Sequence, residues 1–148
     1  MIAAAKSKRE IVTTRIVDAP RDRVFKAWTD PDQLARWWGP KGFQNTFHEF
    51  DLRPGGAWRF IMHAPDGIDY QSESLFVEIV KPERIVFDHI TGPRFTLAAS
   101  FEDLDGKTRV TFCQVFESAA LRDKVAAFAV EANEQNLDRL EAEVARTG

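Results

Sequence analysis

The sequence predicts an α+β domain in which an antiparallel sheet of about seven strands curves around a long C-terminal helix. Two observations indicate this class. Between residues 43 and 116, short runs of β-branched and aromatic residues alternate with turn residues, a spacing typical of an antiparallel meander. After Ser118, a suitable helix N-cap, the periodicity becomes helical and continues to about Ala145. The length of 148 residues suits one such domain.

One strand and two short helices are expected before the meander. β-branched residues dominate residues 11–17, which favours a strand. Pro20 then begins a helix, since proline is favoured at the first helical position. Residues 30–33 (Asp-Pro-Asp-Gln) have the pattern of a capping box and begin a second helix, which the Gly-Pro pair at residues 39–40 ends.

Turns divide the meander, among them residues 53–56 (Arg-Pro-Gly-Gly) and 105–106 (Asp-Gly). The six strands are expected over residues 43–52, 56–63, 69–80, 84–91, 94–103 and 107–116. Alternation assigns each strand an inward and an outward face, except that Phe47 and Phe50 have opposite parity. Either one of these two rings points outward or a β-bulge intervenes.

The C-terminal helix is expected to change the phase of its apolar stripe near residues 128–130. The stripe consists of Leu121, Val125 and Phe128, followed by Val130, Asn133, Leu137, Leu140 and Val144. The change of phase predicts a short helix leading into a long one, or a kink. Because one helix does not fill a curved sheet, the space between the two is the expected ligand site.

Composition and motifs exclude several classes of function. The formal net charge of −3 argues against a dedicated nucleic-acid binder. No apolar run has the length of a membrane span or the pattern of a signal peptide, so a cytoplasmic protein without membrane insertion is expected. The lone Cys113 excludes an internal disulfide. Residues 1–8 are expected to be a flexible tail, and residues 9–148 a single domain.

Cofactor and metal sites are not expected either. The glycines match neither a phosphate-binding loop nor a dinucleotide fingerprint. The three histidines, His48, His63 and His89, have no ligand-like spacing with each other or with Cys113.

An aromatic interior is indicated by 12 Phe and 4 Trp in so short a chain. By parity and position, the residues expected to line it are Trp37, Trp38, Trp58, Phe60, Met62, Tyr70, Glu73, Leu75, Phe87, His89, Phe101, Phe112, Gln114 and Phe128. For the tryptophans at 37 and 38, core packing and lining of the cavity mouth both stay open. The polar members, Glu73, His89 and Gln114, either bond to each other and to water or orient a ligand's polar end.

Several motifs occur in an order that belongs to a known family. They are AP at residues 19–20, VFKAWTDP at 24–31, Leu34, WWGP at 37–40, DLRPGGAWRF at 51–60, PERIVF at 82–87 and NLDRL at 136–140. Together they resemble the START/birch-pollen-allergen (SRPBCC) superfamily and, within it, small bacterial homologues of the activator of the heat-shock protein 90 ATPase. The resemblance covers residues 9–146 and implies a helix-grip fold with a large internal cavity.

The resemblance implies no single activity, because this superfamily includes lipid carriers, cyclases, aglycone-binding proteins and co-chaperones. The eukaryotic activator resembles this chain only in its C-terminal domain, so the family name does not imply a chaperone function.

Three hypotheses follow. The first is a monomer or homodimer that binds a small hydrophobic or aromatic molecule between sheet and helix. The second is a cyclase or hydrolase that uses the same pocket, with Glu73 and His89 as its acid/base pair. The third is a chaperone-linked interaction module, which requires an exposed apolar patch.

Overall fold

A single antiparallel sheet of seven strands, in the order β1-β7-β6-β5-β4-β3-β2, forms the body of the molecule. The computed structural model describes residues 8–147, so the tail expected over residues 1–8 lies outside the described residues except for Lys8. The strands are β1 (Glu10–Val17), β2 (Gln44–Phe50), β3 (Ala57–His63), β4 (Asp69–Val80), β5 (Arg84–His89), β6 (Phe95–Asp103) and β7 (Thr108–Phe116). The sequence prediction of an antiparallel meander is therefore confirmed.

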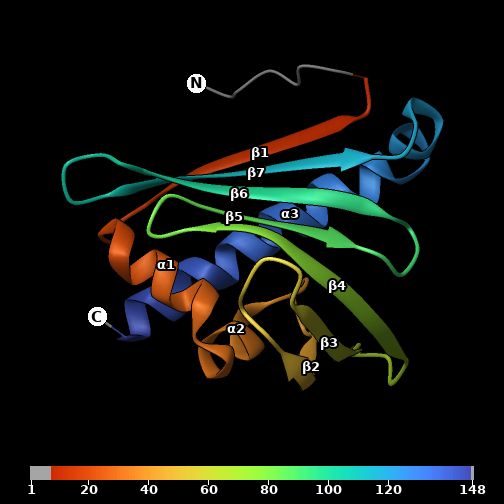
Figure 1. The fold of residues 1–148 in the computed structure, drawn as a ribbon, viewed down its shortest axis with the longest axis horizontal. Coiled ribbons are helices and arrows are strands. Elements are labelled where there is room, and N and C mark those ends of the chain that lie inside the picture. Colours follow the sequence, from red (N-terminus) through yellow and green to blue (C-terminus); the bar gives the residue numbers. More distant parts are fainter. Residues whose placement is uncertain (1–7, 148) are drawn as a thin grey trace.

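Three helices complete the fold: α1 (Arg21–Thr29), α2 (Pro31–Trp37) and α3 (Ala119–Thr147). Figure 1 shows α3 passing behind the sheet, while α1 and α2 lie beside its C-terminal part. The predicted caps are present: the Asp30 carboxylate accepts a hydrogen bond from the Asp32 amide, and the Ser118 hydroxyl accepts one from the Leu121 amide. The α+β helix-grip architecture is thus confirmed.

The face of the sheet that is turned toward the helices, here called the inner face, carries the core. On four strands, the alternation of residues along the sequence predicted correctly which side chains point to this face. On β7 the inward residues Val110, Phe112, Gln114 and Phe116 are buried, as predicted. The same holds for Trp58 and Phe60 on β3, for Ile85 and Phe87 on β5, and for Leu97, Ala99 and Phe101 on β6.

In β2 and β4, a β-bulge determines which side chains point to the inner face. In β2 the register shifts between Phe47 and Glu49, so both Phe47 and Phe50 pack against the core, which confirms the bulge alternative. In β4 the register shifts between Phe76 and Glu78. A bulge adds one residue, so it reverses the alternation on one side of it.

The β4 bulge makes part of the sequence prediction wrong. Ile79 packs on the core as expected, but before the bulge the inward residues are Ser72, Ser74 and Phe76. Leu75 therefore lies on the outer face and is exposed, and Glu73 lies there too, beside Arg59.

The predicted phase change in α3 is also wrong. The helix is continuous, and Ala129 faces the sheet. With Ala129 the buried stripe keeps one phase from Val125 through Asn133 to Leu137. Phe128 is consequently turned away, with 70% of its surface exposed. Ala129 packs with Ile11 and Phe116, a position that hydrophobicity alone does not identify.

Candidate functional site

An aromatic cluster fills the inner face where α1 and α2 cover the sheet. It consists of Trp28, Trp37, Trp38, Trp58, Phe60, Phe87, Phe101 and Phe112. All except Trp38 are buried, and Trp38 is partly exposed. Seven of the fourteen predicted site residues are therefore brought together here, with Trp28 as an addition. Met62 packs against the same cluster.

Two buried indole groups in this cluster lack a hydrogen-bond acceptor. The Trp37 Nε1 donates to the Ala27 carbonyl at 2.9 Å, but the Nε1 atoms of Trp28 and Trp58 have no partner. Aromatic rings surround both groups. A buried donor without an acceptor is uncommon and marks a place where an oxygen or nitrogen acceptor would be stabilised.

A second group of inward side chains, here called the polar set, lies on the inner face and on the part of α3 that faces it. Its members are Thr13, Ser72, Ser74, His89, Gln114, Asn133 and Asn136. The Asn133 amide donates to the Gln114 Oε1 at 2.9 Å and to the Thr13 hydroxyl at 3.4 Å. The predicted inward position of Gln114 is confirmed.

The polar set keeps unused hydrogen-bonding capacity. Within residues 8–147 the Ser72 hydroxyl, the Gln114 Nε2, the Asn133 Oδ1 and the Asn136 Nδ2 make no hydrogen bond. These residues retain 7–9% exposure, in contrast to the 0–2% of most of the aromatic cluster. The polar set is thus oriented inward and can bind an additional polar group.

His89 is a neutral imidazole at physiological pH. Burial lowers its pKa from 6.5 to about 4. The Ser74 hydroxyl lies 3.2 Å from Nδ1, and the Thr91 hydroxyl lies 3.2 Å from Nε2, while Phe95 stacks on the ring with centroids 4.8 Å apart. An imidazole held by two hydroxyls and an aromatic ring is suited to hydrogen bonding rather than to carrying charge.

The acid/base pair expected from the sequence is not formed. His89 lies on the inner face, whereas Glu73 lies on the outer face, 3.7 Å from the Arg59 guanidinium. Tyr70 lies at the rim: it pairs with Met62 and is half exposed, and its ring lies 6.3 Å from that of Phe43.

Two charged groups near the interior, Glu143 and Arg139, have hydrogen-bond partners within the protein. Burial by itself raises the pKa of Glu143, but hydrogen bonds from Arg36 and Arg146 outweigh burial and lower the pKa. Arg139 uses both terminal nitrogens to donate to five carbonyl oxygens at 2.8–3.1 Å. The charge of Glu143 is therefore paired, and the donors of the two Arg139 terminal nitrogens are occupied by backbone carbonyls, while burial lowers the pKa of Arg139.

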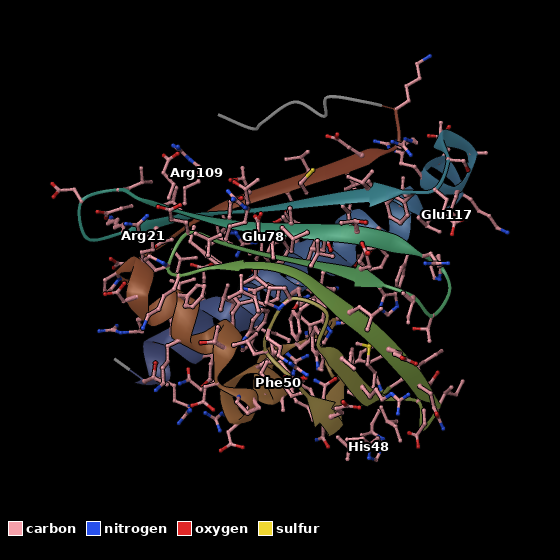
Figure 2. The ribbon with its side chains drawn as sticks, viewed as in Figure 1. Arg21, His48, Phe50, Glu78, Arg109 and Glu117 are labelled. Carbon is pink, nitrogen blue, oxygen red and sulfur yellow. The ribbon has the colours of Figure 1, made fainter. Side chains whose placement is uncertain are left out.

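Two hollows lie outside the interior. One, of about 320 Å³, is lined by His48, Arg59, Phe60, Ile61, Gln71, Ser72, Glu73 and Thr91; Figure 2 labels His48 on β2. The other, of about 250 Å³, adjoins the end of β7, where Figure 2 labels Glu117. Outward side chains, such as Arg59 and Gln71 in the first and Thr96 and Val115 in the second, line them together with inward ones, namely Phe60 and Ser72 in the first and His89, Phe95 and Phe116 in the second. Charged side chains occur in both hollows.

Comparison with known proteins identifies the family. Residues 18–145 match the family described as "Activator of Hsp90 ATPase homolog 1-like protein". The chain belongs to this family. No curated protein matches the chain.

Solved structures share the fold over nearly the whole chain. A solution structure of an Arthrobacter aurescens protein is 25% identical with a TM-score of 0.89, covering 99% of this chain and 91% of that one. A Mycobacterium smegmatis protein is 25% identical with a TM-score of 0.87, covering 100% and 98%. A Nitrosomonas europaea protein is 20% identical with a TM-score of 0.88, covering 97% and 98%.

Two of the family motifs contact each other. The carbonyls that Arg139 of NLDRL binds include those of Trp38, Gly39 and Pro40 in WWGP. The Asn136 Oδ1 accepts a hydrogen bond from the Gly39 amide at 3.1 Å. At Gly39 the φ angle is +101°, and a Cβ there would lie 2.7 Å from the Met62 methyl carbon, so glycine is required. These contacts fix the backbone that carries Trp38.

Sequence reasoning missed several residues of this site. Asn133 and Asn136 were identifiable, because polar residues on a buried helix stripe are unusual. Ser72 and Ser74 were hidden by the β4 bulge.

No helix among residues 8–147 is long and apolar enough to cross a membrane. No group of three or more potential metal ligands occurs in the same part of the chain. The cytoplasmic location and the choice between monomer and homodimer stay predictions.

Proposed function

We propose that the protein binds a small uncharged molecule, with an apolar or aromatic body, between the inner face of the sheet and α3. The observation that carries the proposal is the unused hydrogen-bonding capacity of Ser72, Gln114, Asn133 and Asn136 beside an aromatic cluster. Polar groups turned inward cost free energy unless they are hydrogen-bonded. A ligand with one or two polar atoms would complete these bonds while its body packs on the rings.

The expected ligand is uncharged because of the electrostatics of the interior. His89 is neutral, Glu143 is paired with two arginines, and the donors of the Arg139 terminal nitrogens are occupied by backbone carbonyls. Burying an ionised group against these partners would carry a desolvation cost that nothing offsets. Apolar burial would supply most of the affinity, at about 25 cal/mol per Å².

Binding is favoured over catalysis by the positions of Glu73 and His89. A general acid and a general base must reach the same substrate, and these two side chains lie on opposite faces of the sheet. The family description names an activator of the Hsp90 ATPase, which suggests a protein-docking role. The exposed Phe128 and Val130 lie on either side of the buried Ala129, however, and do not form one patch on α3.

Native mass spectrometry of protein purified from its own host tests the proposal. We expect a defined neutral molecule at close to one per chain, which solvent extraction then identifies. Gln114→Leu should lose most of this molecule. The matched variant Gln71→Leu, which makes the same change on the exposed outer face, should retain it. Equal retention by both variants, or a bound molecule with a formal charge, would contradict the proposal.

A further inference from the structure

Trp38 differs from the other tryptophans in its surroundings. Trp28, Trp37 and Trp58 are buried on regular elements, whereas Trp38 follows the last residue of α2 and is partly exposed. Its ring lies 5.3 Å from both the Trp28 and the Trp58 rings and 6.0 Å from Phe87. Trp38 therefore occupies the space between the two indoles that lack an acceptor.

Hydrogen bonds hold the backbone of Trp38, whereas ring contacts alone hold its side chain. The Trp38 amide donates to the Leu34 carbonyl, and its carbonyl accepts hydrogen bonds from Asn45 at 2.8 Å and Arg139 at 3.1 Å. Its Nε1 makes no hydrogen bond within residues 8–147. Rotation of the side chain toward solvent would break no hydrogen bond, and it would give up only ring contacts, with Trp28, Trp58 and Phe87 among them.

Aromatic rings surround the Trp58 indole. Phe60 and Phe76 stack on this ring, at interplanar angles of 22° and 6°. An indole N–H lies in the plane of its ring, and the rings around the edge of Trp58 are those of Trp38, Phe47, Phe50 and Phe87. An N–H facing an aromatic ring gains only a weak interaction.

We propose that the Trp38 indole holds the place of the ligand's aromatic part, and that a planar bicyclic molecule with a hydrogen-bond acceptor displaces it. The molecule packs against Trp28 and Phe87 and accepts a hydrogen bond from Trp58 Nε1. This inference rests on the proposed function and specifies the ligand class. A conventional acceptor replaces a weak N–H to ring contact, which is the differential interaction that shifts the side chain outward.

The probes that test this proposal are quinoline and naphthalene, which have the same shape but differ in one ring-nitrogen acceptor. In the unmodified protein the ligand must displace Trp38. Its apparent affinity is therefore reduced in proportion to the fraction of molecules in which the Trp38 side chain is turned outward. If that fraction is about 1%, Trp38→Ala binds quinoline about 100-fold more tightly. Adding Trp58→Phe to Trp38→Ala should abolish the preference for quinoline over naphthalene, because the donor is removed.

Fluorine NMR on the unmodified chain, labelled with fluorotryptophan, provides a test that does not depend on a variant folding. On quinoline binding, the Trp38 signal should become sensitive to exchange of H₂O for D₂O, while the Trp37 signal should not. An unchanged Trp38 signal with quinoline bound would overturn the proposal. Equal affinities of Trp38→Ala and the unmodified chain, including the absence of binding by both, would overturn it as well.

Failure of this inference is distinguishable from failure of the proposed function. If the host molecule is bound and lost in Gln114→Leu while the Trp38 signal is unchanged by the ligand, the ligand site stands and displacement of Trp38 is wrong.

Discussion

The aromatic cluster and the polar set occupy one inner face and differ in how they are completed. In the aromatic cluster the rings fill the space among themselves, and within residues 8–147 its buried donors without an acceptor are the indole N–H groups of Trp28 and Trp58. In the polar set, side chains that bond each other, such as Gln114 and Asn133, still retain free donors and acceptors. Stability is therefore expected to depend mainly on the cluster, and the proposed binding function mainly on the polar set.

This contrast separates two kinds of evidence for a site. Rings packed to 0–2% exposure would be expected in any core, so they do not by themselves indicate a ligand. Inward polar groups without a protein partner are not expected from core packing alone, and a ligand can supply the missing hydrogen bonds in place of water. The following predictions test the contrast, from the largest expected effect to the smallest.

Truncation in the aromatic cluster should have the largest effect on stability. Phe87→Ala should lower the free energy of unfolding by about 3–5 kcal/mol, because it removes a fully buried ring. The control Leu75→Ala, on the exposed outer face, should cost less than about 1 kcal/mol. Urea unfolding measures both. Similar losses for the two variants would show that the outer face of β4 is buried in solution.

Arg139 should contribute through the five carbonyls that it binds. Arg139→Lys should lower the free energy of unfolding by about 2 kcal/mol, because a lysine ammonium does not reproduce a planar, two-nitrogen contact. Thermal unfolding checks this prediction. A fully stable Arg139→Lys variant would show that the 36–43 segment is held by other contacts.

His89 should make stability depend on pH. Its pKa of about 4 in the folded chain lies below its usual 6.5, so the unfolded state binds more protons between these values. Stability should therefore fall as pH decreases from 6.5 to 4, by up to about 1.4 kcal/mol per pH unit, and this contribution should be constant above 6.5.

The difference between the unmodified chain and His89→Gln isolates the contribution of His89 from that of the carboxyl groups that titrate in the same range. Urea unfolding across this pH range gives both curves. Parallel curves for the two proteins would contradict a buried, neutral His89.

The bond between Gln114 and Asn133 should have the smallest effect. Asn133→Ala should cost about 1 kcal/mol, because it leaves the Gln114 carbonyl oxygen without its donor. The double variant Gln114→Leu with Asn133→Leu should be close to neutral for stability, since both partners are replaced by apolar groups. It should nevertheless abolish binding of the host molecule. Retained binding in the double variant would show that residues other than Gln114 and Asn133 recognise the ligand.

The fold was predictable because its signals are local. Turn residues located the strands, and alternation assigned the faces of β3, β5, β6 and β7. The two β-bulges show the limit of that reasoning. The phenylalanines at 47 and 50 revealed the first bulge, since two apolar rings of opposite parity conflict. The second bulge, after Phe76, produced no such conflict, because both faces of β4 carry apolar residues.

The candidate site was predictable only in its aromatic part. Large side chains indicate burial, so the buried positions of Trp58, Phe87 and Phe112 were predicted correctly, while their contact with a ligand stays a prediction. Hydrophobicity wrongly favoured Phe128 over Ala129, because the phase of the helix turns the small residue toward Ile11 and Phe116 on the sheet. The missing partners of Gln114 and Asn133 depend on contacts between distant segments, which no local pattern specifies.

A crystal structure of the protein purified from its own host tests the central claim most directly. The account predicts electron density for one neutral molecule between the inner face and α3, within hydrogen-bonding distance of Gln114 or Asn133. Density for a ligand in the hollow beside Arg59 and Glu73 on the outer face, or an interior without any ligand, would contradict the account.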